Sequence, residues 1–199
     1  FDGLPGVLAD ALPDRFGNAI IKAWFENLGQ PDNAMSPVQK LLYMGKRSMG
    51  ALEFRPAIRG GANVQERQPL EIANLVEQAR KLIEGETAVA VAQIMQVGSS
   101  AGGARPKAVI LWNRKKGEVR SGLAAPQPGD EHWIIKFDGV GELDAPNPAS
   151  QPYNRIEYVY SLIARDAGIQ IAETHLLTER SYGHFMVKRF DRDGANRLH

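Results

Sequence analysis

Cysteine is absent from the 199-residue sequence, so disulfide bonds and thiolate metal sites are excluded. An apolar run of the roughly 20 residues that a membrane-spanning helix needs is also missing, as is the basic-then-apolar order of a signal peptide. Net charge is nearly absent, because 24 basic residues face 23 acidic ones. This balance gives no general electrostatic argument for binding nucleic acid or an anionic membrane. We therefore expect a soluble cytoplasmic protein that binds neither directly.

Metal-ligand motifs are missing too. The four histidines, His132, His175, His184 and His199, show neither i, i+4 spacing nor a paired carboxylate motif. We expect them to be structural or exposed, and we predict no metal ligand within this chain.

The most distinctive segment covers residues 97–113, where a glycine-rich stretch leads through Lys107 into a short apolar run. Gly98, Gly102 and Gly103 allow positive φ and carry no Cβ, so successive backbone N–H groups can turn toward one anion. The segment matches neither GxxxxGK[ST] nor GxGxxG. A phosphate-binding loop and a flexible glycine-rich turn therefore both fit the pattern.

Short helical patterns dominate the first 60 residues. A helix is predicted over residues 16–28, and Ser36 with Pro37 supplies an N-cap and a first helical residue for the next helix. A short strand is predicted over residues 50–54. Residues 57–68 are polar and glycine-containing, which indicates a loop or linker.

The remaining sequence alternates between helical and strand-like periodicity. An amphipathic helix is predicted over residues 69–84, and a second over residues 155–167 with Ile156, Val159 and Ile163 on one face. These two apolar stripes fit packing within the domain as well as packing against another chain. Strands are predicted over residues 108–112, 118–121, 132–137, 174–178 and 184–190, the first three as an antiparallel set.

This order of elements is typical of the small lobe of a protein kinase. There, a strand lysine contacts the nucleotide phosphates, a helix glutamate holds that lysine, and the hinge strand offers backbone hydrogen bonds to adenine. The corresponding parts here are Lys136, Glu157 and residues 188–190.

Each of these parts also has a structural explanation. Lys136 fits an edge-strand lysine that discourages aggregation. Glu157, three residues after Asn154, fits a helix-capping pair. The alternating charges of residues 188–192 fit a solvated surface, with Asp191 as a turn residue.

The chain resembles the HipA family of toxin–antitoxin serine/threonine kinases along nearly its whole length. The segments that carry the resemblance are LPGVLADALPDRFG (residues 4–17), MGKRSMGALEF (44–54), SSAGGARPKAVI (99–110), residues 132–137, residues 154–168 and FMVKRFDR (185–192). They resemble the end of the family's N-terminal subdomain, its phosphate loop, its lysine strand, the following helix and its hinge strand.

The resemblance implies an α+β fold with three parts. Residues 1–60 are the end of a mostly helical N-terminal subdomain, and residues 61–98 are a linker and packing helix. Residues 99–199 are a kinase-like small lobe of antiparallel sheet and helix that ends just after the hinge strand. The family's large lobe, with its catalytic aspartate and its metal ligands, is absent, so we expect this chain to be an inactive fragment of a longer protein.

The resemblance also implies a function. It predicts phosphorylation of a protein serine with ATP and Mg, an aminoacyl-tRNA synthetase as the type of target, and a small DNA-binding antitoxin of the HipB type as partner. The implied nucleotide-binding residues are Ser100, Ala101, Gly102, Gly103, Ala104, Lys107, Lys136, Glu157, Lys188 and Phe190. Autophosphorylation of the loop serine, which maps to Ser100 with Ser99 as the alternative, is implied to inactivate the enzyme. The rival hypotheses are a non-catalytic interaction module with a vestigial nucleotide site and a phosphotransferase that acts on a small molecule.

Overall fold

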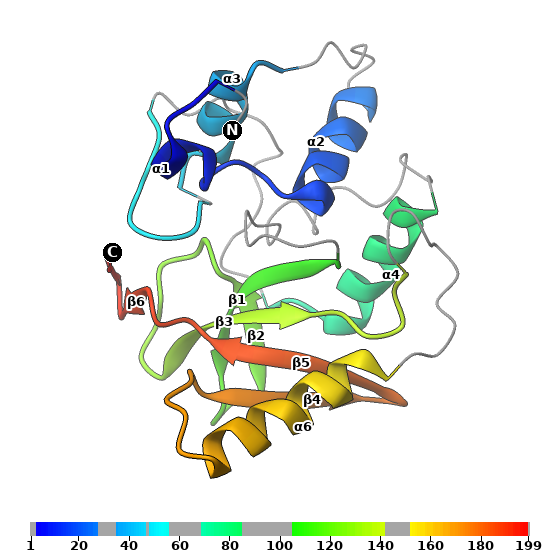
Figure 1. The fold of residues 1–199 in the computed structure, drawn as a ribbon. Coiled ribbons are helices and arrows are strands. Elements are labelled where there is room, and N and C mark those ends of the chain that lie inside the picture. Colours follow the sequence, from blue (N-terminus) through cyan, green and yellow to red (C-terminus); the bar gives the residue numbers. More distant parts are fainter. Residues whose placement is uncertain are drawn as a thin grey trace.

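The structure is a computed structural model that describes residues 3–27, 35–46, 48–55, 69–84, 105–141 and 152–198. Within these ranges, short helices come first along the chain, and an antiparallel sheet with its helices follows (Figure 1). The α+β fold expected from the sequence is confirmed. No helix of the described residues has the length and apolar character needed to cross a membrane.

The described N-terminal part contains three helices. They are α1 (Gly6–Ala9), α2 (Arg15–Asn27) and α3 (Pro37–Met44). The predicted start of α3 is confirmed, because Ser36 Oγ accepts a hydrogen bond from the Gln39 N–H while Gln39 Oε1 accepts one from the Ser36 N–H, at 3.3 and 2.8 Å. Pro37 occupies the first helical position, where its missing N–H costs no hydrogen bond.

The five predicted strands of the C-terminal part are all present, close to their predicted bounds. They are β1 (Lys107–Asn113), β2 (Glu118–Ser121), β3 (Asp130–Lys136), β4 (Thr174–Glu179) and β5 (Tyr182–Lys188). Their order in the sheet is β2-β1-β3-β5-β4, and every neighbouring pair is antiparallel. A short antiparallel hairpin follows the sheet, and each of its strands, β6 (Arg192–Asp193) and β7 (Asn196–Arg197), has two residues.

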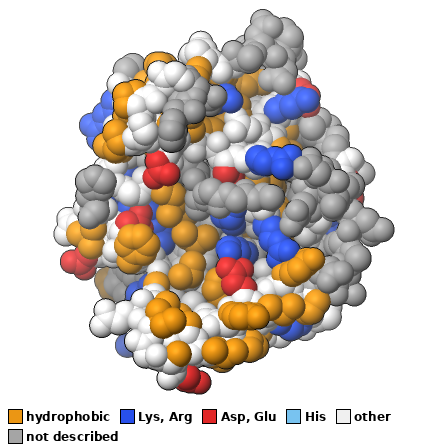
Figure 2. Space-filling view, viewed as in Figure 1, with side chains coloured by type: hydrophobic (Ala, Val, Ile, Leu, Met, Phe, Trp, Pro, Cys, Tyr) orange, Lys and Arg blue, Asp and Glu red, His pale blue; other side chains and the backbone are white. Residues whose placement is uncertain are grey.

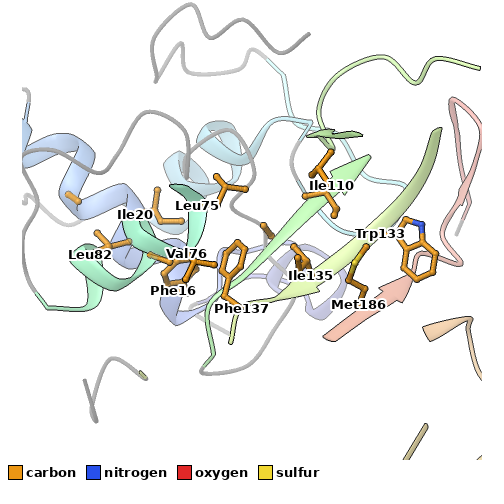
Figure 3. Packing of buried hydrophobic residues seen from close by; sticks show 14 of the residues in the cluster. Phe16, Ile20, Leu75, Val76, Leu82, Ile110, Trp133, Ile135, Phe137 and Met186 are labelled. Carbon is orange, nitrogen blue, oxygen red and sulfur yellow. The ribbon is translucent and has the colours of Figure 1, made fainter. Parts of the chain in front are cut away.

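One face of the sheet carries the main hydrophobic core. The register places Ala108 opposite Ile135 and Ile110 opposite Trp133, so these four side chains share a face. The helix α4 (Ile72–Ile83) lies against this face with α2 beside it (Figure 3). Figure 3 labels the members of this cluster that pack together: Phe16, Ile20, Leu75, Val76, Leu82, Ile110, Trp133, Ile135, Phe137 and Met186.

The helix α6 (Tyr153–Asp166) lies along β4 and β5 (Figure 1). It contacts the opposite face of the sheet, because Ser161 Oγ hydrogen-bonds Thr174 Oγ1 at 2.8 Å, and Thr174 shares a row with Val187 and Ile134. Ile134 alternates with the core residues Trp133 and Ile135. The sheet therefore separates α4 from α6.

Two sequence predictions are corrected by the structure. Residues 50–54 form no strand: residues 50 and 51 are bends and residues 52–54 are irregular. Leu52 O accepts hydrogen bonds from the side chains of Ser48 and Arg197 rather than from a partner strand. The helix predicted from Pro69 begins at Ile72, since Pro69 forms a bridge with Arg120 at the edge of the sheet.

The apolar stripe of α6 is exposed rather than packed within the described structure. Side chains spaced along one face of the helix, Tyr153, Ile156, Val159, Tyr160 and Ile163, are 45–68% exposed. Hydrophobic side chains cover the lower part of the molecule, where α6 runs (Figure 2). A contiguous apolar patch of this kind is typical of a surface that another protein segment covers.

Substitution of Gly139, which lies just after β3, tests how tightly the side chains at this end of the core are packed. Its φ is +72° and a Cβ there would lie 2.3 Å from Tyr182 Cε1, whereas Gly117 has φ +68° with nothing within 4 Å of its Cβ position. We expect Gly117→Ala to cost about 1–2 kcal/mol, from backbone strain alone. We expect Gly139→Ala to cost about 1–3 kcal/mol more, because the methyl group also meets the ring.

Urea unfolding of the two variants, followed by circular dichroism, measures both free energies. Equal losses in the two variants would show that the Tyr182 ring yields to the methyl group.

Candidate functional site

The predicted site residues fall into two groups. Ser99, Ser100 and residues 101–104 lie outside the described residues. Lys107, Lys136, Glu157, Lys188 and Phe190 are all described.

Lys136 and Glu157 form an ion pair between the last residue of β3 and the second turn of α6. Their side chains are 27% and 39% exposed, so the pair lies at the surface of the sheet rather than in its core. The capping interpretation of Asn154 and Glu157 is wrong: α6 has Pro152 as its N-cap without a side-chain hydrogen bond, and the Asn154 amide instead donates to Lys136 O at 3.1 Å. Asn154 thus attaches the start of α6 to the strand at the position of the lysine.

Lys107 lies directly opposite Lys136, on the neighbouring strand β1. Directly opposite residues in a sheet point to the same face, so two cationic side chains lie side by side there. Lys107 Nζ is 3.1 Å from Asp14 Oδ2, and both side chains are only 4% exposed. The structure therefore places Lys107 in a buried ion pair next to the site.

A third cation, Arg105, lies two residues before Lys107 in the chain. The guanidinium of Arg105 lies over the Tyr153 ring at the start of α6, 3.8 Å from the ring centroid. Basic side chains gather between the sheet and α6 on this face of the molecule (Figure 2). Among the described residues, this end of the sheet thus presents several basic side chains, which favours an anionic ligand.

Lys188 does not join this group through its side chain. It lies three residues beyond Phe185, which faces Lys136, and odd steps along a strand reverse the face. Its ammonium instead pairs with Glu131 on the opposite face and lies 3.7 Å from Glu173. Lys188 is the last residue of β5, so only its backbone leads into the segment that corresponds to a kinase hinge.

The segment after β5 contains a backbone N–H that has no partner among the described residues. The Lys188 and Arg189 N–H groups donate to Glu173 O at 2.8 Å and to His132 O at 2.9 Å. The next N–H, that of Phe190, has no hydrogen-bond partner among the described residues, and the Phe190 side chain is 85% exposed. This arrangement fits a kinase-like hinge, in which a backbone N–H donates a hydrogen bond to a planar ring of the ligand.

A buried charge network behind this segment was missed by sequence reasoning. Arg189 donates to both carboxylate oxygens of Asp191, at 2.8 and 2.7 Å, and the Gly50 N–H donates to Asp191 Oδ2 at 2.9 Å. Arg192 Nη1 also donates to Asp191 Oδ2, at 3.0 Å. The expectation of solvated charges and a simple turn is wrong here, since Arg189 and Asp191 are both buried. An alternating charge pattern does not distinguish exposed side chains from pairs that fold back on each other.

The pKa of Asp191 reflects this network. Burial raises the pKa, but the hydrogen bonds and charge of Arg189, with the Gly50 N–H and Arg192, outweigh it and lower the pKa to about 2. Burial also lowers the pKa of the Arg192 guanidinium, to about 10. Asp191, which bonds the Gly50 N–H of the N-terminal part, is therefore a charged carboxylate at neutral pH.

The turn after Lys136 contains a second cluster that the sequence did not reveal. His184 is fully buried, and its Nδ1 accepts the Asp138 N–H at 3.0 Å, which leaves the proton on Nε2. The Asp138 carboxylate accepts the Gly183 N–H at 2.8 Å and lies 3.6 Å from Arg155 of α6. This cluster ties the turn to β5 and to α6. Groups of side chains able to hold a metal ion are absent from the described part of the chain.

Two family models match the sequence. The HipA-like C-terminal domain matches residues 99–199, and the HipA N-terminal domain matches residues 1–55. No protein of curated function matches.

A solved structure is similar in fold. It is HipA from a complex of the Shewanella oneidensis MR-1 toxin–antitoxin system, which contains HipA, HipB and operator DNA. The TM-score is 0.51 at 22% sequence identity, over 94% of this chain and 38% of that chain. The present chain thus spans well under half the length of that relative.

The His184 cluster predicts a pH dependence of stability. Burial lowers the pKa of His184, while the carboxylates of Asp138 and Glu179 oppose this shift and Arg155 adds to it. Because the folded state keeps His184 neutral, its contribution to stability is complete above the unfolded pKa of about 6.5 and is lost as the pH falls below it. We expect the free energy of unfolding to fall between pH 7 and pH 5, by up to about 1.4 kcal/mol per pH unit for this one group.

His184→Asn retains an acceptor near the Nδ1 position and does not titrate, so it is the matched variant. Burial also lowers the pKa of His132 and of His175, and these groups remain in both proteins. The difference between the two pH profiles of unfolding free energy therefore isolates His184. Parallel profiles would contradict the prediction.

Proposed function

Because this chain belongs to the HipA family, we propose that it is the ATP-binding part of a serine/threonine protein kinase of a toxin–antitoxin system. The observation that carries the proposal is the Lys136–Glu157 ion pair, which joins the end of β3 to α6 directly beside Lys107. A strand lysine held by a helix glutamate is the arrangement that kinases use to bind nucleotide phosphates.

Other described residues support nucleotide binding. Lys136 is partly exposed and therefore accessible to a phosphate group, and Arg105 adds positive charge. The N–H of Phe190, which has no partner among the described residues, suits a hydrogen bond from the hinge to adenine. It lies five residues beyond Phe185, the register partner of Lys136, or about 17 Å along the strand. Residues 100–104 are proposed to complete the phosphate site with their backbone N–H groups.

Phosphoryl transfer is proposed for the longer protein rather than for this chain. ATP and Mg are the proposed cofactors, and the metal ligands and the catalytic base are assigned to the part that the HipA relative has beyond the 38% spanned here. The exposed apolar face of α6 fits contact with further protein.

The target and the partner of the longer protein are proposed from its family. A protein serine is the proposed acceptor, in an aminoacyl-tRNA synthetase as the type of target, and Ser100 is the proposed site of inactivating autophosphorylation. A HipB-like antitoxin is the proposed partner, supported by the solved relative, whose complex contains HipB and operator DNA. We propose a cytoplasmic location and no direct contact of this chain with nucleic acid.

The second candidate is a non-catalytic interaction module. The exposed stripe of α6 favours it, because an apolar face of this kind suits a protein partner whether or not nucleotide binds. Its nucleotide site would be vestigial, and replacement of Lys136 would then leave the function of the complete protein unchanged.

The first test is binding of MgATP to the 199-residue chain. We expect weak binding, which Lys136→Met reduces by about tenfold or more because the partner of the phosphates and of Glu157 is lost. Lys115→Met, in the exposed turn between β1 and β2, is the control and should leave the affinity unchanged. Isothermal titration calorimetry measures the three affinities. Equal affinities would favour the interaction module.

The second test is autophosphorylation of the full gene product with MgATP, followed by peptide mapping. We expect phosphate on Ser100, or on Ser99 beside it, and none in the 199-residue chain under the same conditions. Ser100→Ala separates the two serines. Phosphorylation of the isolated 199-residue chain would contradict the assignment of the catalytic groups to the rest of the protein.

A further inference from the structure

We propose that Asp14, which lies 93 residues before Lys107 in the chain, is a positioning residue for Lys136. By neutralising Lys107, it leaves Glu157 free to pair with Lys136. The inference rests on the proposed function only where ATP affinity is concerned, because the arrangement of charges itself is independent of nucleotide.

The need for Asp14 arises from the register of the sheet. Lys107 and Lys136 are directly opposite on β1 and β3, and like charges at directly opposite positions repel. Each lysine therefore requires a carboxylate. Asp14 supplies one from the start of α2, and Glu157 supplies the other from α6.

The two pairs differ in burial. Lys107 and Asp14 are each 4% exposed, so water screens their charges little, whereas Lys136 and Glu157 are partly exposed. If the charge of Asp14 is lost, the buried Lys107 ammonium loses one carboxylate partner, and the carboxylate of Glu157 is able to move. Glu157 is then drawn toward Lys107 and away from Lys136.

Asp14 is itself held in place by helix α2. Its Oδ1 accepts the Gly17 N–H at 2.7 Å, in the manner of a helix N-cap, while its Oδ2 faces Lys107. Asparagine is as good an N-cap as aspartate, so Asp14→Asn removes the charge and keeps the cap. The variant therefore separates the electrostatic role of Asp14 from its role in starting α2.

The test is the acylation rate of the Lys136 amine in the 199-residue chain, measured with an isotope-coded acylating reagent and peptide mass spectrometry. In Asp14→Asn we expect the rate at Lys136 to rise by about threefold or more, the change that fits loss of a partly exposed ion pair. MgATP affinity should fall by about tenfold, as expected when a phosphate-binding group is misplaced.

The double variant Asp14→Asn with Lys107→Met gives a result that a merely structural role would not. It removes both buried charges, so Glu157 should return to Lys136 and the acylation rate should return toward that of the unmodified chain. If acylation of Lys136 stays as fast as in Asp14→Asn, the inference is overturned; MgATP affinity does not decide here, because Lys107 itself is among the implied nucleotide-binding residues.

The chain offers a matched control in Arg120 and Asp130. This ion pair is buried to a similar degree, with 4% and 2% of the side chains exposed, and lies at the other end of β3. Asp130→Asn should lower stability without changing the acylation of Lys136. If Asp130→Asn raises that rate as much as Asp14→Asn, general loosening of the sheet explains the effect and Asp14 has no positioning role.

The two readouts separate the inference from the proposed function. If no protein binds MgATP but Asp14→Asn still raises the acylation rate and the double variant restores it, the proposed function fails and the positioning role stands. If MgATP binds and Lys136 acylation is unchanged in Asp14→Asn, the positioning role fails and the proposed function stands.

Discussion

Two lysines that face each other across neighbouring strands set the constraint on which much of this structure depends. Lys107 and Lys136 share one face at one end of the sheet, where their mutual repulsion must be offset. The chain meets this requirement with carboxylates from two distant segments, Asp14 before α2 and Glu157 in α6. The positions of both helices are thereby coupled to the charge pattern of the sheet.

A second coupling joins the N-terminal part to the opposite end of β3 and β5. Asp191 and its arginine partners are buried, and the carboxylate also accepts the Gly50 N–H. Breaking a buried ion pair costs about 3–5 kcal/mol, because the remaining charge is left in a poorly solvated place. The N-terminal part therefore contacts both ends of the candidate nucleotide site and acts as part of its support.

Several elements were predictable because local chemistry decides them. The start of α3 follows from the reciprocal hydrogen bonds of Ser36 and Gln39, and the strands follow from their two-residue alternation. The pairing of Lys136 with Glu157 was one of two interpretations of the sequence, and the other, a helix cap formed by Asn154 and Glu157, is wrong. The irregular backbone of residues 50–54 was missed because the side chains of Arg192 and Arg197, far along the chain, bind Gly50 O and Leu52 O in place of a partner strand.

The sequence by itself determined the longer helices, the five strands of the sheet and the family, since periodicity, capping and motif order are properties of neighbouring residues. Only the tertiary structure decided which charges are buried and which partner each one has. Nothing local distinguishes Lys107, buried against Asp14, from Lys136, partly exposed against Glu157, nor shows that the side chain of Lys188 faces away from both. Burial and ion pairing depend on strand register and on contacts between segments that are distant in the chain, and those are fixed only when the chain folds.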